Sequence, residues 1–169
     1  MMTTSKAATV AAAVAMIACA LPLRAQDSGI PIGTKAPGFA IENLTGQKVD
    51  VSQYIGKSPV LIEFWATWCE NCHALEPSLI AAQKKYGSRV KFIGVAVSFN
   101  ESTNRVKLYA EKHGLVHEIL YDRAGDASAA YDVPATSYVV VIDKAGKVVY
   151  TGLGADQDLE KAIEKGLRQ

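Results

Sequence analysis

Two cysteines separated by two residues, Cys69 and Cys72, carry the most readily interpreted chemistry in this sequence. An apolar run that is typical of a buried strand precedes them at residues 60–66. The residues that follow favour a helix, so Cys69 is expected at its N-terminus. A helix N-terminus stabilises the thiolate, the form of cysteine that attacks disulfides. The pattern indicates a dithiol in which Cys69 is the attacking thiolate and Cys72 the resolving thiol.

Strand and helix patterns alternate around this motif and indicate an α/β domain. Helices are predicted at residues 69–86, 103–113 and 156–167, with a helical turn at 127–131. Strands are predicted at residues 59–65, 90–97, 116–120, 138–142 and 148–150, and an N-terminal hairpin at 39–51. Strands that alternate with helices imply parallel pairing, and the late hairpin implies an antiparallel edge.

Length and charge fit one ordinary globular domain. The chain has 169 residues, 49% of them hydrophobic and 21% charged, with a formal net charge of +1. This composition argues against a disordered chain. Because the sequence has no basic cluster, we expect no nucleic-acid partner.

The first 25 residues have the pattern of a secretory signal peptide, with Lys6 followed by an apolar stretch and small residues. Cleavage after Ala25 would leave a single domain at residues 26–169. The alternatives are a lipoprotein signal that ends at Cys19 and an uncleaved membrane anchor. Cleavage would also leave only the 69/72 cysteine pair, which suits a working dithiol better than a disulfide-stabilised scaffold.

Three motifs together resemble the thioredoxin superfamily, and most closely its TlpA/ResA-like extracytoplasmic branch. Residues 64–69 read Phe-Trp-Ala-Thr-Trp-Cys, like the family's F-W-A-x-W-C, and Pro77 lies eight residues after Cys69. Residues 33–39 resemble the branch's G-x-x-A-P-x-F. The resemblance covers about residues 33–166 and implies a thioredoxin-like three-layer sandwich with an N-terminal β-hairpin.

The resemblance also implies a function and its partners. We expect an enzyme, a periplasmic thiol-disulfide oxidoreductase that reduces protein disulfides without a cofactor or a metal. A membrane thiol donor would keep it reduced, and an apocytochrome c thiol pair is one candidate substrate. We expect the protein to be a monomer.

Glu63 lies within the apolar strand, at the position where the family carries a buried acid. A buried carboxylate is costly unless it is neutral or paired. We therefore predict that Glu63 accepts the Cys72 proton when that thiol attacks. The alternative is that a strand edge exposes Glu63 to solvent.

The residues beside the cysteines are expected to tune the redox couple. Glu70 disfavours a thiolate at Cys69, and neither Glu70 nor Asn71 is the Pro or His that would favour an oxidant. We predict a reducing couple nearer thioredoxin (about −270 mV) than DsbA (about −120 mV). Trp68 is expected to pack beside the dithiol and to contact substrate.

The family's cis-proline loop differs in this chain. Aligning residues 131–143 with the family's pattern places Ser137 at the proline position, and Pro134 lies three residues earlier. A cis bond before a non-proline residue costs about 2.5–4 kcal/mol, so we predict a trans Thr136–Ser137 bond. Thr136 and Ser137 are expected to contact substrate, or to donate a hydrogen bond to the Cys69 thiolate. The alternative alignment makes Pro134 the cis residue.

Two other functions use the same cysteines. His73 completes the C-x-x-C-H pattern of covalent haem attachment, with His113 or His117 as a second axial ligand. Cys69, Cys72 and His73 would alternatively bind a metal, as in a copper-handling protein of this fold.

Overall fold

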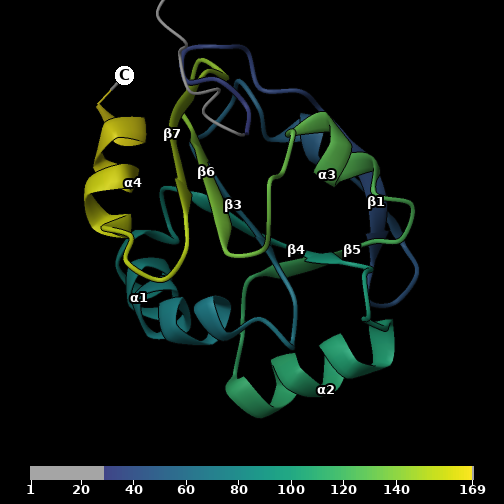
Figure 1. The fold of residues 1–169 in the computed structure, drawn as a ribbon. Coiled ribbons are helices and arrows are strands. Elements are labelled where there is room, and N and C mark those ends of the chain that lie inside the picture. The colour runs from purple at the N-terminus through teal and green to yellow at the C-terminus, as the bar shows by residue number, and fades with distance from the viewer. Residues whose placement is uncertain (1–28, 169) are drawn as a thin grey trace, which may run out of the picture.

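The computed structural model describes residues 29–168 and contains one seven-stranded sheet. Its strands are β1 (Ala40–Asn43), β2 (Lys48–Asp50), β3 (Val60–Trp65), β4 (Lys91–Val97), β5 (Glu118–Asp122), β6 (Tyr138–Ile142) and β7 (Val148–Leu153). Their order across the sheet is β2-β1-β5-β4-β3-β6-β7. The strand that leads into the cysteine motif, β3, therefore lies in the interior of the sheet (Figure 1).

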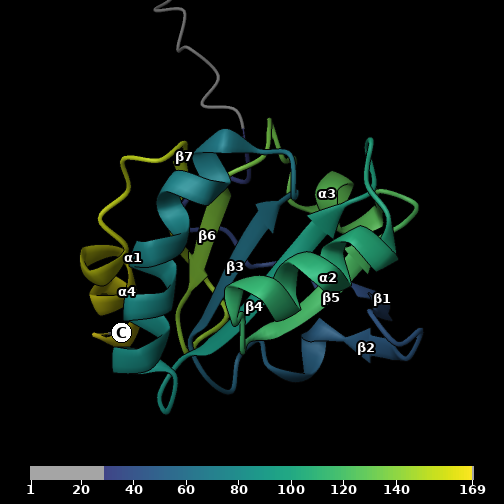
Figure 2. The ribbon, with the colours of Figure 1, turned by 90° about the horizontal axis from the view of Figure 1, so that it is seen from below.

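Helices cover both faces of this sheet. They are α1 (Glu70–Tyr86), α2 (Thr103–His113), α3 (Asp126–Ala130) and α4 (Leu159–Leu167), and a short 3-10 helix, η1, spans Val51–Gln53. Figures 1 and 2 show α1, α2 and α4 against one face and α3 against the other. The predicted thioredoxin-like three-layer sandwich is confirmed.

Strand pairing also agrees with the prediction. β3 runs parallel to β4, and β4 runs parallel to β5, as expected for strands joined through helices. β6 pairs antiparallel with β3 and with β7, which forms the late hairpin. The sequence did not reveal that the N-terminal hairpin, β1–β2, joins the sheet through β5.

All six residues of β3 are buried because both faces of the strand are covered. Ile62 and Phe64 point into the core beneath α3, together with Tyr131. Leu61 packs against α1 and α4, and Trp65 packs in a separate cluster with both cysteines and α2. Since side chains alternate along a strand, Glu63 lies between Leu61 and Trp65 on the face beneath α1 and α2.

Helix boundaries follow local capping. The Ser102 hydroxyl accepts a hydrogen bond from the Arg105 amide and begins α2, which ends at Gly114 with a positive φ of 66°. The last helix was predicted from residue 156 but begins at Leu159. The Asp158 carboxylate accepts a hydrogen bond from the Lys161 amide and sets this start.

Two strand boundaries also differ from the prediction. The strand predicted at residues 116–120 lies at 118–122, because Gly114 ends α2 and the chain needs residues 115–117 to reach the sheet. The strand predicted at 148–150 extends to Leu153, opposite Tyr138. Within residues 29–168 no helix has both the length and the apolar character needed to cross a membrane. The predicted signal segment, residues 1–25, lies outside the described residues.

Candidate active site

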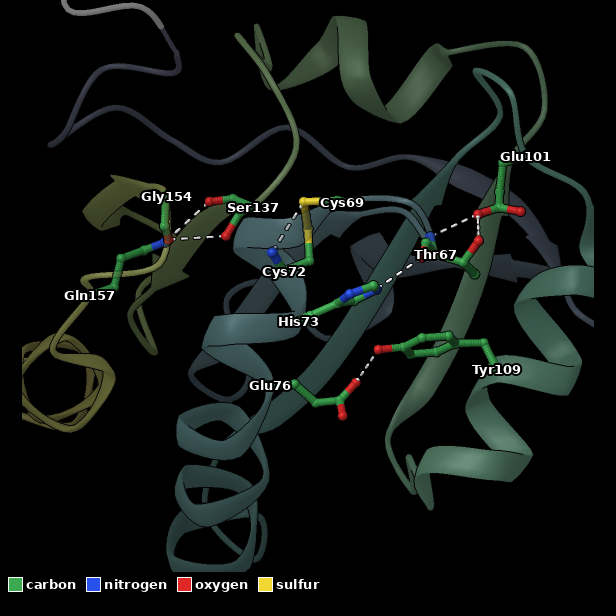
Figure 3. The surroundings of a disulfide bond; sticks show 10 residues. All are labelled: Thr67, Cys69, Cys72, His73, Glu76, Glu101, Tyr109, Ser137, Gly154 and Gln157. Atoms are coloured by element: carbon green, nitrogen blue, oxygen red, sulfur yellow. Dashed lines mark hydrogen bonds between the residues drawn. A yellow bond between two sulfur atoms is a disulfide. The ribbon is translucent and has the colours of Figure 1, made fainter.

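Cys69 and Cys72 form a disulfide at the N-terminus of α1. Cys69 is the N-cap residue, with an extended backbone, and its sulfur accepts a hydrogen bond from the Cys72 backbone amide at 3.1 Å. Figure 3 shows this pair at the top of α1, between the Ser137 loop and Thr67. The location that the sequence predicted, a dithiol at a helix start after a buried strand, is confirmed.

Both cysteines are buried in this disulfide form. Cys69 is 5% exposed and Cys72 is 4% exposed. The two exposed fractions are nearly equal, so exposure does not separate the two cysteines in the oxidised protein. The helix N-cap position, rather than exposure, is therefore what distinguishes Cys69 from Cys72 here. Glu70 and Asn71, between them, are exposed to solvent.

Glu63 is a buried acid, with 5% of its surface exposed. This rules out the alternative of a solvent-exposed strand edge. Burial raises the pKa of Glu63 to about 8, and the nearby negative charge of Glu76 adds to the shift. At neutral pH the carboxyl therefore holds its proton most of the time. A carboxyl with this pKa can donate or accept a proton near neutral pH.

Glu76 links α1 to α2 beside this acid. Its carboxylate accepts a hydrogen bond from the Tyr109 hydroxyl at 2.8 Å and pairs with Nδ1 of His113 at 2.8 Å. The Tyr109 ring stacks on His113 and on His73, with centroids 3.8 and 5.4 Å apart. Sequence reasoning missed Glu76, although its position four residues after Cys72 places the two on one helix face.

A second acid, Glu101, holds the turn that precedes Cys69. Its carboxylate accepts hydrogen bonds from the backbone amide of Thr67 at 2.8 Å and from the Thr67 hydroxyl at 2.6 Å. The Thr67 carbonyl also pairs with Nε2 of His73 at 2.9 Å (Figure 3). These contacts position the turn between β3 and α1. Nothing in the sequence pattern pointed to Glu101, because its partner lies 34 residues away.

Trp68 and Phe99 form an exposed aromatic pair next to the disulfide. Trp68 is 43% exposed and Phe99 is 71% exposed, and their rings meet edge to face with centroids 6.1 Å apart. The Trp68 indole N–H donates a hydrogen bond to the Phe99 carbonyl at 2.9 Å. Exposed aromatic side chains next to a reactive group are common contact residues for protein partners.

The loop that contains Ser137 lies beside the disulfide, with serine rather than proline at this position (Figure 3). No peptide bond in the described residues is cis, so the predicted trans Thr136–Ser137 bond is confirmed and Pro134 is not the cis residue of the alternative alignment. Ser137 is fully buried with φ at 63°. Its amide donates to the Phe64 carbonyl at 2.9 Å, and its hydroxyl donates to the Gly154 carbonyl at 3.0 Å.

The residues that would bind a metal ion or a haem do not form a binding site in the described part of the chain. Among residues 29–168, no three His, Cys, Asp or Glu side chains form a group that could hold a metal ion. The proposed axial ligand His113 is paired with Glu76 on α2, and His73 contacts the Thr67 carbonyl. Neither metal handling nor haem attachment is favoured by this arrangement.

The fold and the dithiol at the start of α1 define a thiol-disulfide oxidoreductase of the thioredoxin superfamily. The Redoxin family model matches residues 31–167, and the chain belongs to this family. Within the superfamily it is TlpA/ResA-like.

The curated relatives and solved structures that this chain resembles are named for the thioredoxin family or for thiol-disulfide exchange. The chain is 32% identical over 144 residues to the thiol-disulfide oxidoreductase ResA of Geobacillus kaustophilus, covering 82% of this chain and 80% of that protein. It is 29% identical to the thioredoxin-like protein YneN of Bacillus subtilis, covering 82% of each. A thiol:disulfide interchange protein from Chlorobium tepidum superposes with a TM-score of 0.70 at 25% identity, covering 81% and 98% of the two chains.

Proposed function

We propose that this protein is an exported reductant of protein disulfides, with Cys69, Cys72 and Glu63 as its catalytic residues. The observation that carries the proposal is the Cys69–Cys72 pair at the N-terminus of α1, which follows directly on the strand that buries Glu63. A helix N-terminus favours the Cys69 thiolate, and a buried carboxyl with a pKa of about 8 is suited to proton transfer near neutral pH.

The reaction proceeds in two exchanges. The Cys69 thiolate attacks a substrate disulfide, which forms a mixed disulfide and releases one substrate thiolate. Cys72 then loses its proton to the Glu63 carboxylate and attacks the Cys69 sulfur, which releases the second substrate thiolate. The substrate gains two electrons, and the enzyme becomes the Cys69–Cys72 disulfide, the state that the structure contains.

Substrate binding would use the exposed surface around Cys69. Trp68, which precedes Cys69 in the chain, forms an exposed aromatic pair with Phe99, and the Ser137 loop lies beside the disulfide (Figure 3). Because the Ser137 hydroxyl already donates to Gly154, its contribution would come through the shape of the loop. The partly buried Thr136 is the residue of this loop whose side chain is proposed to contact substrate.

The direction of electron flow is proposed from the residues between the cysteines. Glu70 and Asn71 are both exposed, and the Glu70 carboxylate lies beside Cys69 in sequence. Its charge disfavours the thiolate and so favours a reducing couple, nearer to about −270 mV than to about −120 mV. We propose that a membrane thiol donor regenerates the dithiol and that an apocytochrome c thiol pair is among the substrates.

The location is proposed from the leader. Residues 1–25 have the pattern of a secretory signal, which would deliver residues 26–169 to the periplasm as a monomeric domain. Retention of the leader as an anchor, or lipidation at Cys19, would hold the same domain at the membrane. Either case leaves the chemistry of the dithiol unchanged.

A trapping experiment tests the proposed function. In the Cys72→Ser variant the mixed disulfide at Cys69 cannot be resolved, so substrates should remain covalently attached in cells and be released by dithiothreitol. The matched control, Cys69→Ser, should trap far less. If the two variants trap the same proteins to the same extent, Cys69 is not the interchange cysteine and the proposal fails.

A further inference from the structure

Gly94 on β4 leaves a space beside the buried Glu63. The two residues are partners in the parallel pairing of β3 and β4. Their side-chain positions therefore lie next to each other on the face beneath α1 and α2. A Cβ atom at position 94 would lie 2.9 Å from Nε1 of Trp65 and 2.9 Å from Nε2 of His117. The absent side chain of Gly94 thus gives two polar nitrogen atoms a place beside Glu63.

His117 connects this buried space with the protein surface. It lies between the end of α2 and the start of β5, and it lines two surface clefts. One cleft runs along α2 past Lys107 and Glu111, and the other runs past Tyr54 and Lys91. One edge of the imidazole therefore faces the neighbourhood of Glu63, and the residue as a whole borders solvent-accessible space.

Two nitrogen atoms of this cluster are buried without a hydrogen-bond partner in the described part of the chain, Nε1 of Trp65 and Nδ1 of His117. Such atoms are rare in folded proteins and are usually satisfied by ordered water. Burial lowers the pKa of His117 to about 4. The ring is therefore neutral at neutral pH, and one nitrogen can donate a proton while the other accepts one.

The proposed role of Glu63 as a base requires a nearby group that can exchange protons with it. With a pKa of about 8 it holds a proton at neutral pH, and it must lose that proton before it can serve as a base. Only 5% of its surface is exposed, so exchange with bulk water requires a polar route. The cysteines and α1 cover one side of the site, whereas the Gly94 space and His117 lie on the β4 side.

We propose that His117 carries protons between Glu63 and the surface clefts, an inference that rests on the proposed role of Glu63 as the base. In the outward direction the Glu63 O–H bond breaks and a ring nitrogen of His117 gains the proton, directly or through one water molecule. The other ring nitrogen, the buried Nδ1, then passes a proton to a water molecule bound beside the ring, from which it reaches the clefts that His117 lines. The reverse sequence protonates Glu63 again, and no electrons move. Because His117 acts through Glu63, it is a positioning residue.

Other charged and titratable groups surround this route. On α1, the negative charge of Glu76 favours both protonated His117 and protonated Glu63. On α2, Tyr109 and His113 bind that carboxylate and hold it in place. At the cleft, the Glu118 carboxylate next to His117 is paired with Lys91 at 2.6 Å, which offsets its charge.

The test follows the two exchanges separately. One equivalent of the aromatic disulfide DTNB, whose thiolate is coloured, is mixed with reduced protein. The first thiolate release reports the attack by Cys69, and the second reports resolution by Cys72. His117→Phe keeps a planar ring and removes both nitrogens. We expect an unchanged first release and a second release slowed about tenfold at neutral pH, which is less than the roughly 10²–10⁴ typical of a group that itself takes the proton.

Rescue separates proton transfer from a structural role. In His117→Ala, added imidazole should enter the cleft and restore much of the second-release rate. Gly94→Ala, whose Cβ would lie 2.9 Å from Nε2 of His117 and so push the ring away from this position, should also slow the second release. Val116→Ala, a change at the exposed neighbour of His117, is the control and should match the wild-type protein.

The failures of the two proposals are distinguishable in the same assay. If Glu63→Gln slows the second release and His117→Phe does not, Glu63 is the base but His117 is not its proton route. If neither variant slows it, the role of Glu63 is also wrong. A slow His117→Ala variant that imidazole does not rescue assigns His117 a packing role and overturns the inference.

Discussion

The sulfur atom of Cys69 accepts a hydrogen bond from the backbone amide of Cys72, at 3.1 Å, so the first cysteine of the motif is itself the N-cap of α1. An N-cap group normally accepts from an amide two or three residues along the helix. After reduction a Cys69 thiolate would accept the same bond more strongly than a thiol would. The helix dipole acts in the same direction, so both effects favour the thiolate at Cys69 over Cys72.

Selective alkylation should follow from this geometry. With limiting iodoacetamide and reduced protein at neutral pH, we expect modification mainly at Cys69, because the helix N-terminus and the amide hydrogen bond favour its thiolate. Fragment-ion mass spectrometry of the peptide that contains both cysteines measures the distribution. Equal modification of Cys72 would contradict the assignment. The Cys69→Ser variant, which retains only the resolving thiol, gives the reference rate for Cys72.

Replacing Glu63 should change the pH dependence of stability. Its pKa is about 8 in the folded protein, against an ordinary value of 4.5 for an exposed glutamate, so the folded protein binds an additional proton between these values. Wild-type stability contributed by this group is present below about pH 4.5 and is lost as the pH rises through 8. Glu63→Gln remains neutral and should be the more stable protein near pH 9, by on the order of 4 kcal/mol.

Urea unfolding of the oxidised proteins at about pH 5 and about pH 9 measures this effect. The difference in the free energy of unfolding between variant and wild type should be small at the lower pH and large at the higher. A difference that is the same at both pH values would show that the folded pKa of Glu63 is not raised.

Glu76 should tune the Glu63 acid from α1. Its carboxylate is a nearby like charge, so Glu76→Gln should lower the pKa of Glu63. Carboxyl carbon NMR of reduced protein measures that pKa, and the pH profile of the second thiolate release should shift to lower pH with it. The control is Glu111→Gln on the exposed side of α2. An unshifted Glu63 resonance in Glu76→Gln would remove Glu76 from the site.

Proline should not be tolerated at Ser137, the position that our alignment matches to the family's proline. Proline requires φ near −65°, whereas Ser137 has φ of 63° and its amide donates to the Phe64 carbonyl. We expect Ser137→Pro to lower the free energy of unfolding by about 3 kcal/mol or more. Ser137→Gly accepts the positive φ and loses only the bond to Gly154, so its cost should be about 0.5–1.5 kcal/mol.

Thermal or urea unfolding of both variants tests this comparison. If the proline variant is as stable as the wild type, the loop must change conformation readily, and its observed backbone would not be a requirement of this fold. If both variants lose the same stability, the hydroxyl bond to Gly154 rather than the backbone would be the principal contribution of Ser137.

The dithiol and most elements could be predicted because their signals are local. The apolar run before Cys69 identifies a strand covered on both faces, and Ser102 and Gly114 bound α2 by chemistry readable within a few residues. The trans Thr136–Ser137 bond also follows from the residue type alone, through the cost of a cis bond. The predictions were wrong at some ends of helices and strands. The start of α4 is an example, because the Asp158 cap alone places it at Leu159.

The sequence by itself determined the α/β class and the redox pair, since each depends on residue type and period along the chain, whereas it left open whether Glu63 is buried. Only the tertiary structure decided what surrounds Glu63. Glu76 finds its partners on α2, and Gly94, the strand partner of Glu63, leaves room for a ring nitrogen of His117. These contacts join segments far apart in the chain, and their side chains follow no shared period. Which of them meet depends on strand order, register and helix packing, which are properties of the folded protein as a whole.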